Sequence, residues 1–161
     1  LLLRVDVMTA EVPNASDLGA FLAHTVETTE RQEAWRAVAR LLRRLAQTGV
    51  WHPDLNAKNV LIMLPPPPPP PPPPAVIPIG GEEIAATQEL PTAVVLDIDR
   101  VKLVVPGDPQ LAEANLERLL RSLRKWARDA RNGPPVNDAE LTAFAELVRE
   151  NAAAAAPAPA S

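Results

Sequence analysis

The chain has 161 residues, of which 47% are hydrophobic, and it carries a formal net charge of −4. This length suits one folded unit with its own core and is short for two. The mild acidity argues against a nucleic-acid-binding surface, which needs a clustered excess of lysine and arginine. The absence of cysteine excludes disulfides and thiolate chemistry. No apolar run approaches the roughly 20 residues that a membrane-spanning helix needs.

The first third of the chain predicts a strand followed by two helices. Residues 1–8 are apolar and β-branched and are followed by a Pro-Asn turn, which is typical of a strand. Ser16 is expected to cap a short helix over residues 17–26. A longer helix over residues 30–47 has apolar side chains at helical spacing and is expected to stop at Gly49. Because the chain starts with leucine inside a predicted strand, we expect the sequence to begin within a larger protein.

The middle of the chain predicts short strands separated by a proline-rich insert. Strands are expected over residues 60–64 and 93–97, with a third over residues 102–105. Residues 65–74 are ten consecutive prolines, which lack amide donors and adopt polyproline II. We interpret residues 65–92 as a disordered insert that is tolerated as a long surface loop. A docking ligand for a polyproline-binding partner is the alternative, which we favour less.

The last third predicts two helices and a tail. The first helix is expected over residues 109–131, with Asp108 as its cap and a proline in its first position. Asn137, followed three residues later by a glutamate, predicts the start of the second helix. Residues 152–161 are rich in alanine and proline, which predicts a disordered tail. We therefore expect one α+β, mainly helical domain over residues 1–151.

The most specific chemical signal is the segment from His52 to Asn59, HPDLNAKN. It matches the kinase catalytic-loop template H-x-D-L-x-x-x-N at every fixed position. In that template a carboxylate accepts the proton of the acceptor hydroxyl, and an amide oxygen further along the loop reaches the metal ion on the ATP phosphates. Asp54 is therefore the candidate base and Asn59 a candidate metal ligand. The helix predicted before the loop and the strand predicted after it are the context that the template requires.

A second acidic motif follows the strand over residues 93–97. The sequence LDIDR places Asp97 where kinases carry the metal-binding aspartate of the DFG motif, with Ile98 in place of phenylalanine and Asp99 in place of glycine. Mg²⁺ takes one or two carboxylates together with phosphate oxygens and water, and Asp97 with Asn59 can supply its protein ligands. The alternative is an aspartate that only ends a strand at a turn.

These motifs resemble the lipopolysaccharide kinase (Kdo/WaaP) family, whose members phosphorylate Kdo (3-deoxy-D-manno-octulosonic acid) in the lipopolysaccharide inner core. The resemblance spans about residues 5–126 without the proline insert. It is carried by DVMTAEVPNASDL at 6–18, HPDLNAKNVLI at 52–62, LDIDR at 96–100 and NLERLLRSLRKW at 115–126.

The resemblance implies a protein-kinase-like C-terminal lobe with short β-hairpins at the catalytic loop. Residues 1–12 would form the hinge strand, and the N-terminal lobe would be absent from this sequence. ATP and Mg²⁺ are the implied cofactors, with adenine near Glu11 and Val12 and above Leu61. The implied acceptor is Kdo-lipid A, which suggests peripheral membrane contact at the cytoplasmic face of the inner membrane.

Two features separate this chain from a complete protein kinase. Pro53 replaces the arginine of protein kinases, so an activation loop clamped by phosphothreonine is not expected. The 161 residues contain no glycine-rich loop or strand lysine ahead of the predicted hinge strand, and phosphoryl transfer depends on the positioning that those parts supply. We therefore expect the 161 residues alone to be inactive.

The alternatives to a Kdo kinase are another small-molecule kinase, such as an aminoglycoside-type kinase, a protein kinase, or a non-catalytic pseudokinase binding module.

Overall fold

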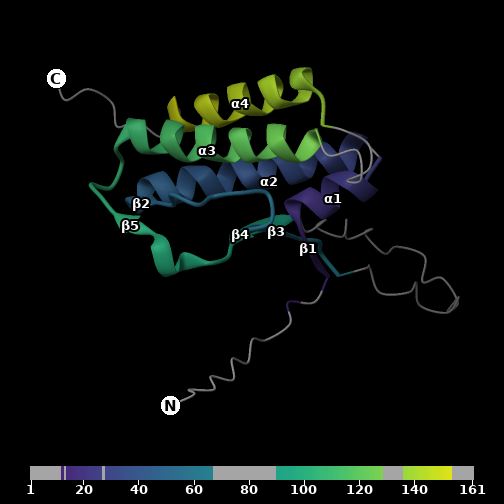
Figure 1. Cartoon of the computed structure of the whole chain (residues 1–161), viewed down its shortest axis with the longest axis horizontal. Coiled ribbons are helices and arrows are strands. Elements are labelled where there is room, and N and C mark those ends of the chain that lie inside the picture. The colour runs from purple at the N-terminus through teal and green to yellow at the C-terminus, as the bar shows by residue number, and fades with distance from the viewer. Residues whose placement is uncertain (1–11, 13, 27, 67–89, 129–135, 154–161) are drawn as a thin grey trace, which may run out of the picture.

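The computed structural model describes residues 12, 14–26, 28–66, 90–128 and 136–153. Three long helices are stacked over a small antiparallel sheet (Figure 1), namely α2 (Thr28–Gln47), α3 (Pro109–Ala127) and α4 (Asp138–Ala153). Each of these helices contacts the other two, and α2 also packs against the sheet. The expected mixed and mainly helical class is confirmed. In the described ranges, no helix is both long and apolar enough to cross a bilayer.

The sheet is built so that two chain segments meet at one of its edges. Its strand order is β1 (Ala15–Asp17), β3 (Val60–Met63) and β4 (Thr92–Val95), all antiparallel. Val60, at the start of β3, pairs with Val95, at the end of β4. The residues just before β3 and just after β4 are therefore neighbours. A separate two-stranded sheet pairs β2 (Val50–Trp51) with β5 (Lys102–Leu103). Along the chain, β2 precedes the first of these segments and β5 follows the second.

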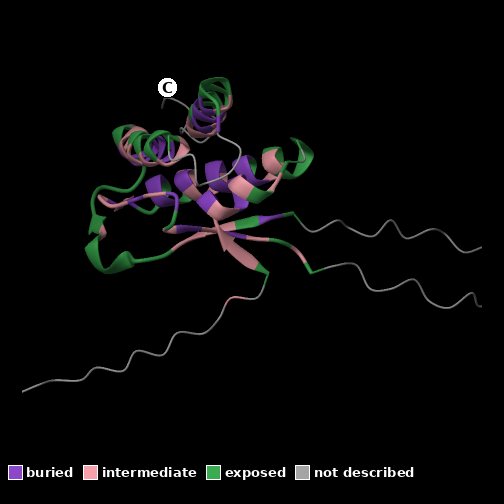
Figure 2. Cartoon of the chain, turned by 45° about the vertical axis from the view of Figure 1, so that its right-hand side comes forward, coloured by how far each residue is buried: buried purple, intermediate pink, exposed green. Residues whose placement is uncertain are grey.

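The core lies between the helices and the sheet. Figure 2 shows the buried sides of the helices turned toward one another and toward the strands. The apolar side chains expected on the inner faces of α2 and α3 are buried and share one cluster, except Trp126, which is only partly buried against it. They are Trp35, Val38, Leu42, Leu45, Leu116, Leu119, Leu120 and Leu123.

The short helix α1 (Leu18–His24) begins one residue later than expected, and the prediction that Ser16 caps it is wrong. Its cap is Asp17, whose Oδ1 accepts a hydrogen bond from the Ala20 amide at 2.8 Å. Ser16 instead belongs to β1, where it pairs with Ile62. Strand β1 extends through Asp17, which pairs with Leu61, so the chain turns into the helix only after Asp17 and this residue takes the cap position.

The other two predicted caps are confirmed. Asp108 Oδ1 accepts from the Gln110 amide at 2.9 Å, and a proline occupies the start of α3. Asn137 Oδ1 accepts from the Glu140 amide at 2.8 Å at the start of α4. Gly49, with φ of 72°, follows α2 as expected. Helix α3 ends at Ala127.

The strands are shorter than the sequence predicted, and several predictions cannot be compared with the structure. Strand β4 ends at Val95, because the chain then leaves the ladder through Asp97, which has φ of 59°, into a 3-10 turn over Ile98–Arg100. The hinge strand up to residue 11, residues 67–89 of the insert, residues 129–131 and the tail from residue 154 lie outside the described residues.

Candidate active site

One buried asparagine of α3 holds the predicted catalytic loop, residues 52–59, in place. Asn115 Oδ1 accepts from the His52 amide at 3.0 Å, and its Nδ2 donates to the Val50 carbonyl at 2.9 Å. Asn115 is fully buried, and its bond to the His52 amide is buried with it, so that bond does not compete with water. Sequence reasoning did not assign this role, although an asparagine within the apolar stripe of α3 was visible.

Hydrogen bonds within the loop hold Asn59 against Asp54. The Nδ2 atoms of Asn56 and Asn59 donate to the Asp54 carbonyl at 3.0 and 3.1 Å. Asn56 Oδ1 in turn accepts from the amides of Lys58 and Asn59. The buried side chain of Leu55 anchors the centre of the loop. Because its nitrogen is engaged, the amide oxygen of Asn59 is the atom left to face a cation.

The same loop reaches the residue before Asp97. The Leu96 amide donates to the Asn59 carbonyl at 2.7 Å. His52 is fully buried, and its Nε2 lies 3.2 Å from the Leu96 carbonyl oxygen. A carbonyl only accepts, so Nε2 carries the hydrogen. Nδ1 of His52 is buried without a hydrogen-bond partner among the residues that the structure describes. Asp54, Asn59 and Asp97 therefore lie at one edge of the sheet.

The electrostatics of this edge favour a cation. The pKa of Asp97 is raised, first by a side-chain hydrogen bond with Asp99 and by the negative charge of Asp99. Burial and the charge of Asp54 raise the pKa further, while His52 opposes the shift. A divalent cation would relieve the repulsion between these carboxylates.

The donor set fits Mg²⁺ rather than a metal held entirely by protein. Within the described ranges, no group of three or more histidine, cysteine or acidic residues is arranged to hold a metal ion. Mg²⁺ keeps several waters and binds substrate phosphates, so one carboxylate and one amide oxygen suffice for it. Asp97 and Asn59 would be those ligands.

Asp54 has a partner that the sequence did not reveal. Nη2 of Arg118, on α3, donates a hydrogen bond to Asp54 Oδ1 at a nitrogen–oxygen distance of 3.1 Å. The Asp54 side chain is 44% exposed, and a carboxylate offers about four lone-pair positions. Asp54 can therefore keep this ion pair and still accept a proton from a hydroxyl group.

The residues expected at adenine are only partly described. Leu61 is half-buried on β3, between the buried Val60 and Ile62, so its side chain points to the face of the sheet away from the core. Val12 is half-buried in irregular structure. Glu11 lies outside the described residues.

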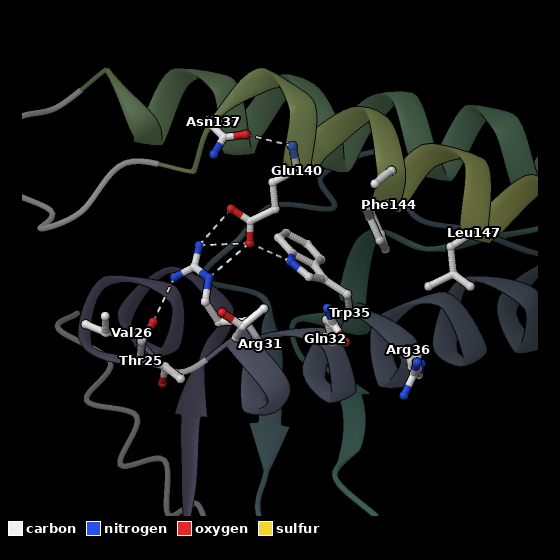
Figure 3. Close-up of a pocket in the computed structure, with 12 residues that line it drawn as sticks. Thr25, Val26, Arg31, Gln32, Trp35, Arg36, Asn137, Glu140, Phe144 and Leu147 are labelled. Carbon is white, nitrogen blue, oxygen red and sulfur yellow. Dashed lines mark hydrogen bonds and ion pairs between the residues drawn. The ribbon is translucent and has the colours of Figure 1, made fainter.

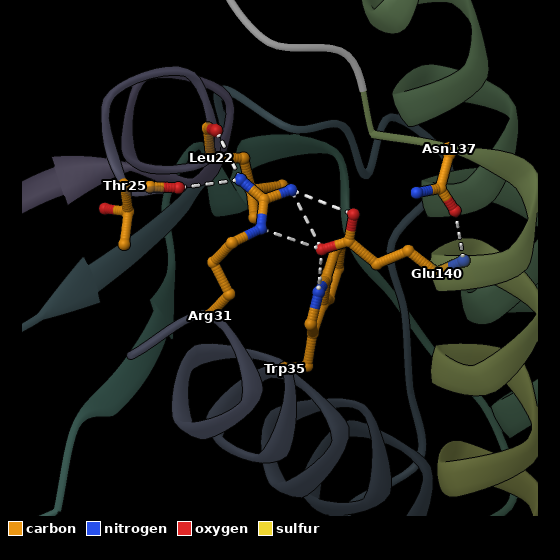
Figure 4. A network of polar contacts seen from close by, with 6 residues as sticks. All are labelled: Leu22, Thr25, Arg31, Trp35, Asn137 and Glu140. Carbon is orange, nitrogen blue, oxygen red and sulfur yellow. Dashed lines mark hydrogen bonds and ion pairs between the residues drawn. The ribbon is translucent and has the colours of Figure 1, made fainter. Parts of the chain in front are cut away.

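A cavity of about 620 Å³ lies between α2 and α4, and no residue of the catalytic loop lines it (Figure 3). At one end, Arg31 donates to both carboxylate oxygens of Glu140 at 3.0 and 2.9 Å, and Trp35 Nε1 donates to the same carboxylate at 2.8 Å (Figure 4). Arg31 also donates to the Leu22 and Thr25 carbonyls. This network joins α1, α2 and α4, so the polar groups of this cavity have a structural role.

Comparison with known proteins finds similarity to one family in the part of the chain that contains the predicted catalytic loop. Residues 1–67 match the lipopolysaccharide kinase (Kdo/WaaP) family. The 3-deoxy-D-manno-octulosonic acid kinase of Actinobacillus succinogenes is 44% identical over 59 residues, which are 37% of this chain and 23% of that protein. The kinases of the same name from Haemophilus influenzae (strain PittEE) and Vibrio cholerae are 39% identical over 59 residues and 37% identical over 62 residues.

These matches cover 37% and 38% of this chain, and 23% and 25% of the two relatives. The chain thus spans about a quarter of the length of the curated relatives it matches. No solved structure matches it. The family match contains Asp54 and Asn59 and ends before Asp97, so beyond residue 67 the expected resemblance rests on the motifs alone. Over its first 67 residues, the chain is similar to the lipopolysaccharide kinase (Kdo/WaaP) family, as the catalytic-loop sequence predicted.

Proposed function

We propose that this chain carries the catalytic loop of an ATP-dependent kinase that phosphorylates a hydroxyl group of Kdo in the lipopolysaccharide inner core. One observation carries the proposal: the loop that matches the kinase template is hydrogen-bonded to the segment that bears Asp97. The bonds are Leu96 amide to Asn59 carbonyl at 2.7 Å and Asn59 Nδ2 to Asp54 carbonyl at 3.1 Å. These bonds support a common reaction site for the proposed base and the proposed metal ligands.

In this mechanism each side chain has a separate task. Asp54 accepts the proton of the attacking hydroxyl while the new oxygen–phosphorus bond forms and the bond to the leaving ADP oxygen breaks. Mg²⁺, when bound with ATP, neutralises the charge of the phosphate oxygens. Asn59 and Asp97 would hold the metal, and His52 and Asn115 keep the loop in position. Leu61, with Glu11 and Val12, would contact adenine.

The acceptor and the location are part of the proposal. The similar proteins are named 3-deoxy-D-manno-octulosonic acid kinases, which supports Kdo-lipid A as the acceptor. An acceptor anchored in lipid would bring the protein into peripheral contact with the cytoplasmic face of the inner membrane. Because the matched segment is 23% of such a relative, we propose that further sequence completes the ATP site and that residues 1–161 alone do not transfer phosphate.

The test is phosphate transfer from labelled ATP to Kdo-lipid A by the full-length protein. We expect Asp54→Asn to lower kcat by at least about 100-fold, the usual contribution of a general base. The control is Asp138→Asn, the same chemical change at an exposed residue in the first turn of α4. Equal kcat in the two variants would refute the role of Asp54.

The identity of the labelled product separates the remaining readings. Phosphate on Kdo supports the proposed acceptor. Phosphate on an aminoglycoside or on a protein, with none on Kdo, would contradict it and favour another kinase class. Absence of both magnesium-dependent ATP binding and transfer in the full-length protein would favour a non-catalytic binding module.

A further inference from the structure

A cavity of about 670 Å³ opens beside Asp54 and is lined by four basic side chains. Arg118, Arg121 and Lys125 come from α3, and Lys58 comes from the catalytic loop. Residues three and four apart share one face of a helix, so the three α3 residues point to the same side. We call this hollow the basic cavity.

The described residues neutralise only part of the charge of the basic cavity. Among them, Asp54 is the only acidic residue that lines the cavity, and it is already paired with Arg118. In the part of the chain that the structure describes, the side chains of Lys58, Arg121 and Lys125 form no ion pair or hydrogen bond. This excess of positive charge occurs in a chain whose net charge is −4. Such a site attracts a carboxylate or phosphate group.

A solvated helix face is the ordinary explanation for a row of basic residues. On such a face, glutamate and arginine four residues apart usually pair with one another. Here Glu117 forms no ion pair with Arg121, and Glu113 is paired with Arg149 of α4 instead. These acidic side chains line a hollow of about 370 Å³, which shares Arg121 with the basic cavity. The basic cavity therefore differs from a solvated face because it is concave and because only one of its four basic side chains, Arg118, is in an ion pair with a described residue.

The lining residues indicate which substrate the basic cavity would hold. Asp54 lines it, whereas Asn59 and Asp97 do not. A base must lie next to the acceptor hydroxyl, while the metal ligands lie next to the nucleotide phosphates. The cavity is thus on the acceptor side of the candidate site.

We propose that the basic cavity binds an anionic group of the acceptor, a carboxylate or a phosphate, and thereby brings the reacting hydroxyl to Asp54. This inference rests on the proposed kinase function. It assigns acceptor recognition to Lys58, Arg118, Arg121 and Lys125. An acceptor without negative charge would bind poorly, because the cavity offers cations without counterions.

The test compares two double variants of the full-length protein. Arg121→Gln with Lys125→Gln removes two cavity charges that do not contact Asp54. Two exposed ionic contacts are lost, so the KM for Kdo-lipid A is expected to rise about tenfold, with kcat and the KM for ATP unchanged. The control, Arg44→Gln with Arg124→Gln, removes the same charge outside the cavity and should leave the KM unchanged.

Modified acceptors identify the anion. In one acceptor the Kdo carboxylate is a methyl ester, in the second the lipid A phosphates are removed, and in the third both changes are made. The modification that abolishes the KM difference between wild type and the cavity variant identifies the group bound. A difference that persists with the third acceptor would overturn the proposal.

The outcomes separate this inference from the proposed function. If wild type phosphorylates Kdo and the cavity variant has the same KM, the function stands and the cavity proposal fails. A rise in the KM for ATP instead would assign the cavity to the nucleotide and also overturn it. If wild type phosphorylates no acceptor, the proposed function fails. Calorimetric binding of Kdo-lipid A to wild type and the cavity variant then tests the cavity alone, and equal affinities refute it.

Discussion

Replacing Asn115 by leucine should loosen the catalytic loop and destabilise the fold. Asn115 is fully buried and forms two hydrogen bonds, to the His52 amide at 3.0 Å and the Val50 carbonyl at 2.9 Å. Leucine has a similar volume but forms neither bond. Each backbone group left unpaired in the core costs about 1–3 kcal/mol, and the added apolar burial returns about 1 kcal/mol. The free energy of unfolding should fall by about 3 kcal/mol.

Urea unfolding of the full-length protein, followed by tryptophan fluorescence, measures this change. The control is Gln110→Leu, which exchanges an exposed amide side chain for leucine on the same helix. Since the His52 end of the loop would no longer be held, kcat for Kdo should also fall in the Asn115 variant alone. A loss below about 1 kcal/mol relative to the control would show that the two hydrogen bonds do not anchor the loop.

Two further predictions concern ion pairs on α4. Glu140→Gln should lower the free energy of unfolding by about 2–3 kcal/mol, because Arg31 keeps its charge in a site where its side chain is only 13% exposed. Thermal unfolding measures this change, with the exposed Glu150→Gln variant as the control. Equal melting temperatures of the two variants would contradict the prediction. The hydrogen bond from Arg149 lowers the pKa of Glu113, so this pair stabilises the fold above the ordinary carboxyl value of 4.5 and stops doing so as the pH falls through the lowered pKa. Glu113→Gln should therefore lower stability by up to about 1 kcal/mol at pH 7 and by nothing near pH 2, and a difference that is independent of pH would refute this.

Local sequence patterns predicted the helices because their causes are local. Apolar spacing determines which face of α2 and of α3 is buried, and a cap such as Asp108 acts on an amide two residues away. The cap of α1 was mispredicted for a reason that is not local. Ser16 and Asp17 are both good cap residues, and the choice between them depends on how far β1 pairs with β3. The pairing extends to Asp17 and Leu61, so the helix begins after Asp17.

The candidate site also has features that the local sequence predicts and features that depend on distant contacts. Asp54 and Asn59 are recognisable in the sequence because one short loop must present both groups, and Asp97 because it follows a strand. Their common position depends on the antiparallel pairing of Val60 with Val95. The sequence predicted a hairpin here only through the family resemblance, because the proline insert separates the two strands along the chain.

The amino-acid sequence by itself determined the mainly helical class, the kinase-like loop and the family that the loop resembles. Only the tertiary structure decided that Asn115 holds the loop and that Arg118 meets Asp54. The physical reason is that spacing along the chain specifies which face of α3 is buried, whereas its contacts depend on how the helix lies against a loop some 60 residues away. The basic cavity likewise exists only because Lys58 is folded against that helix.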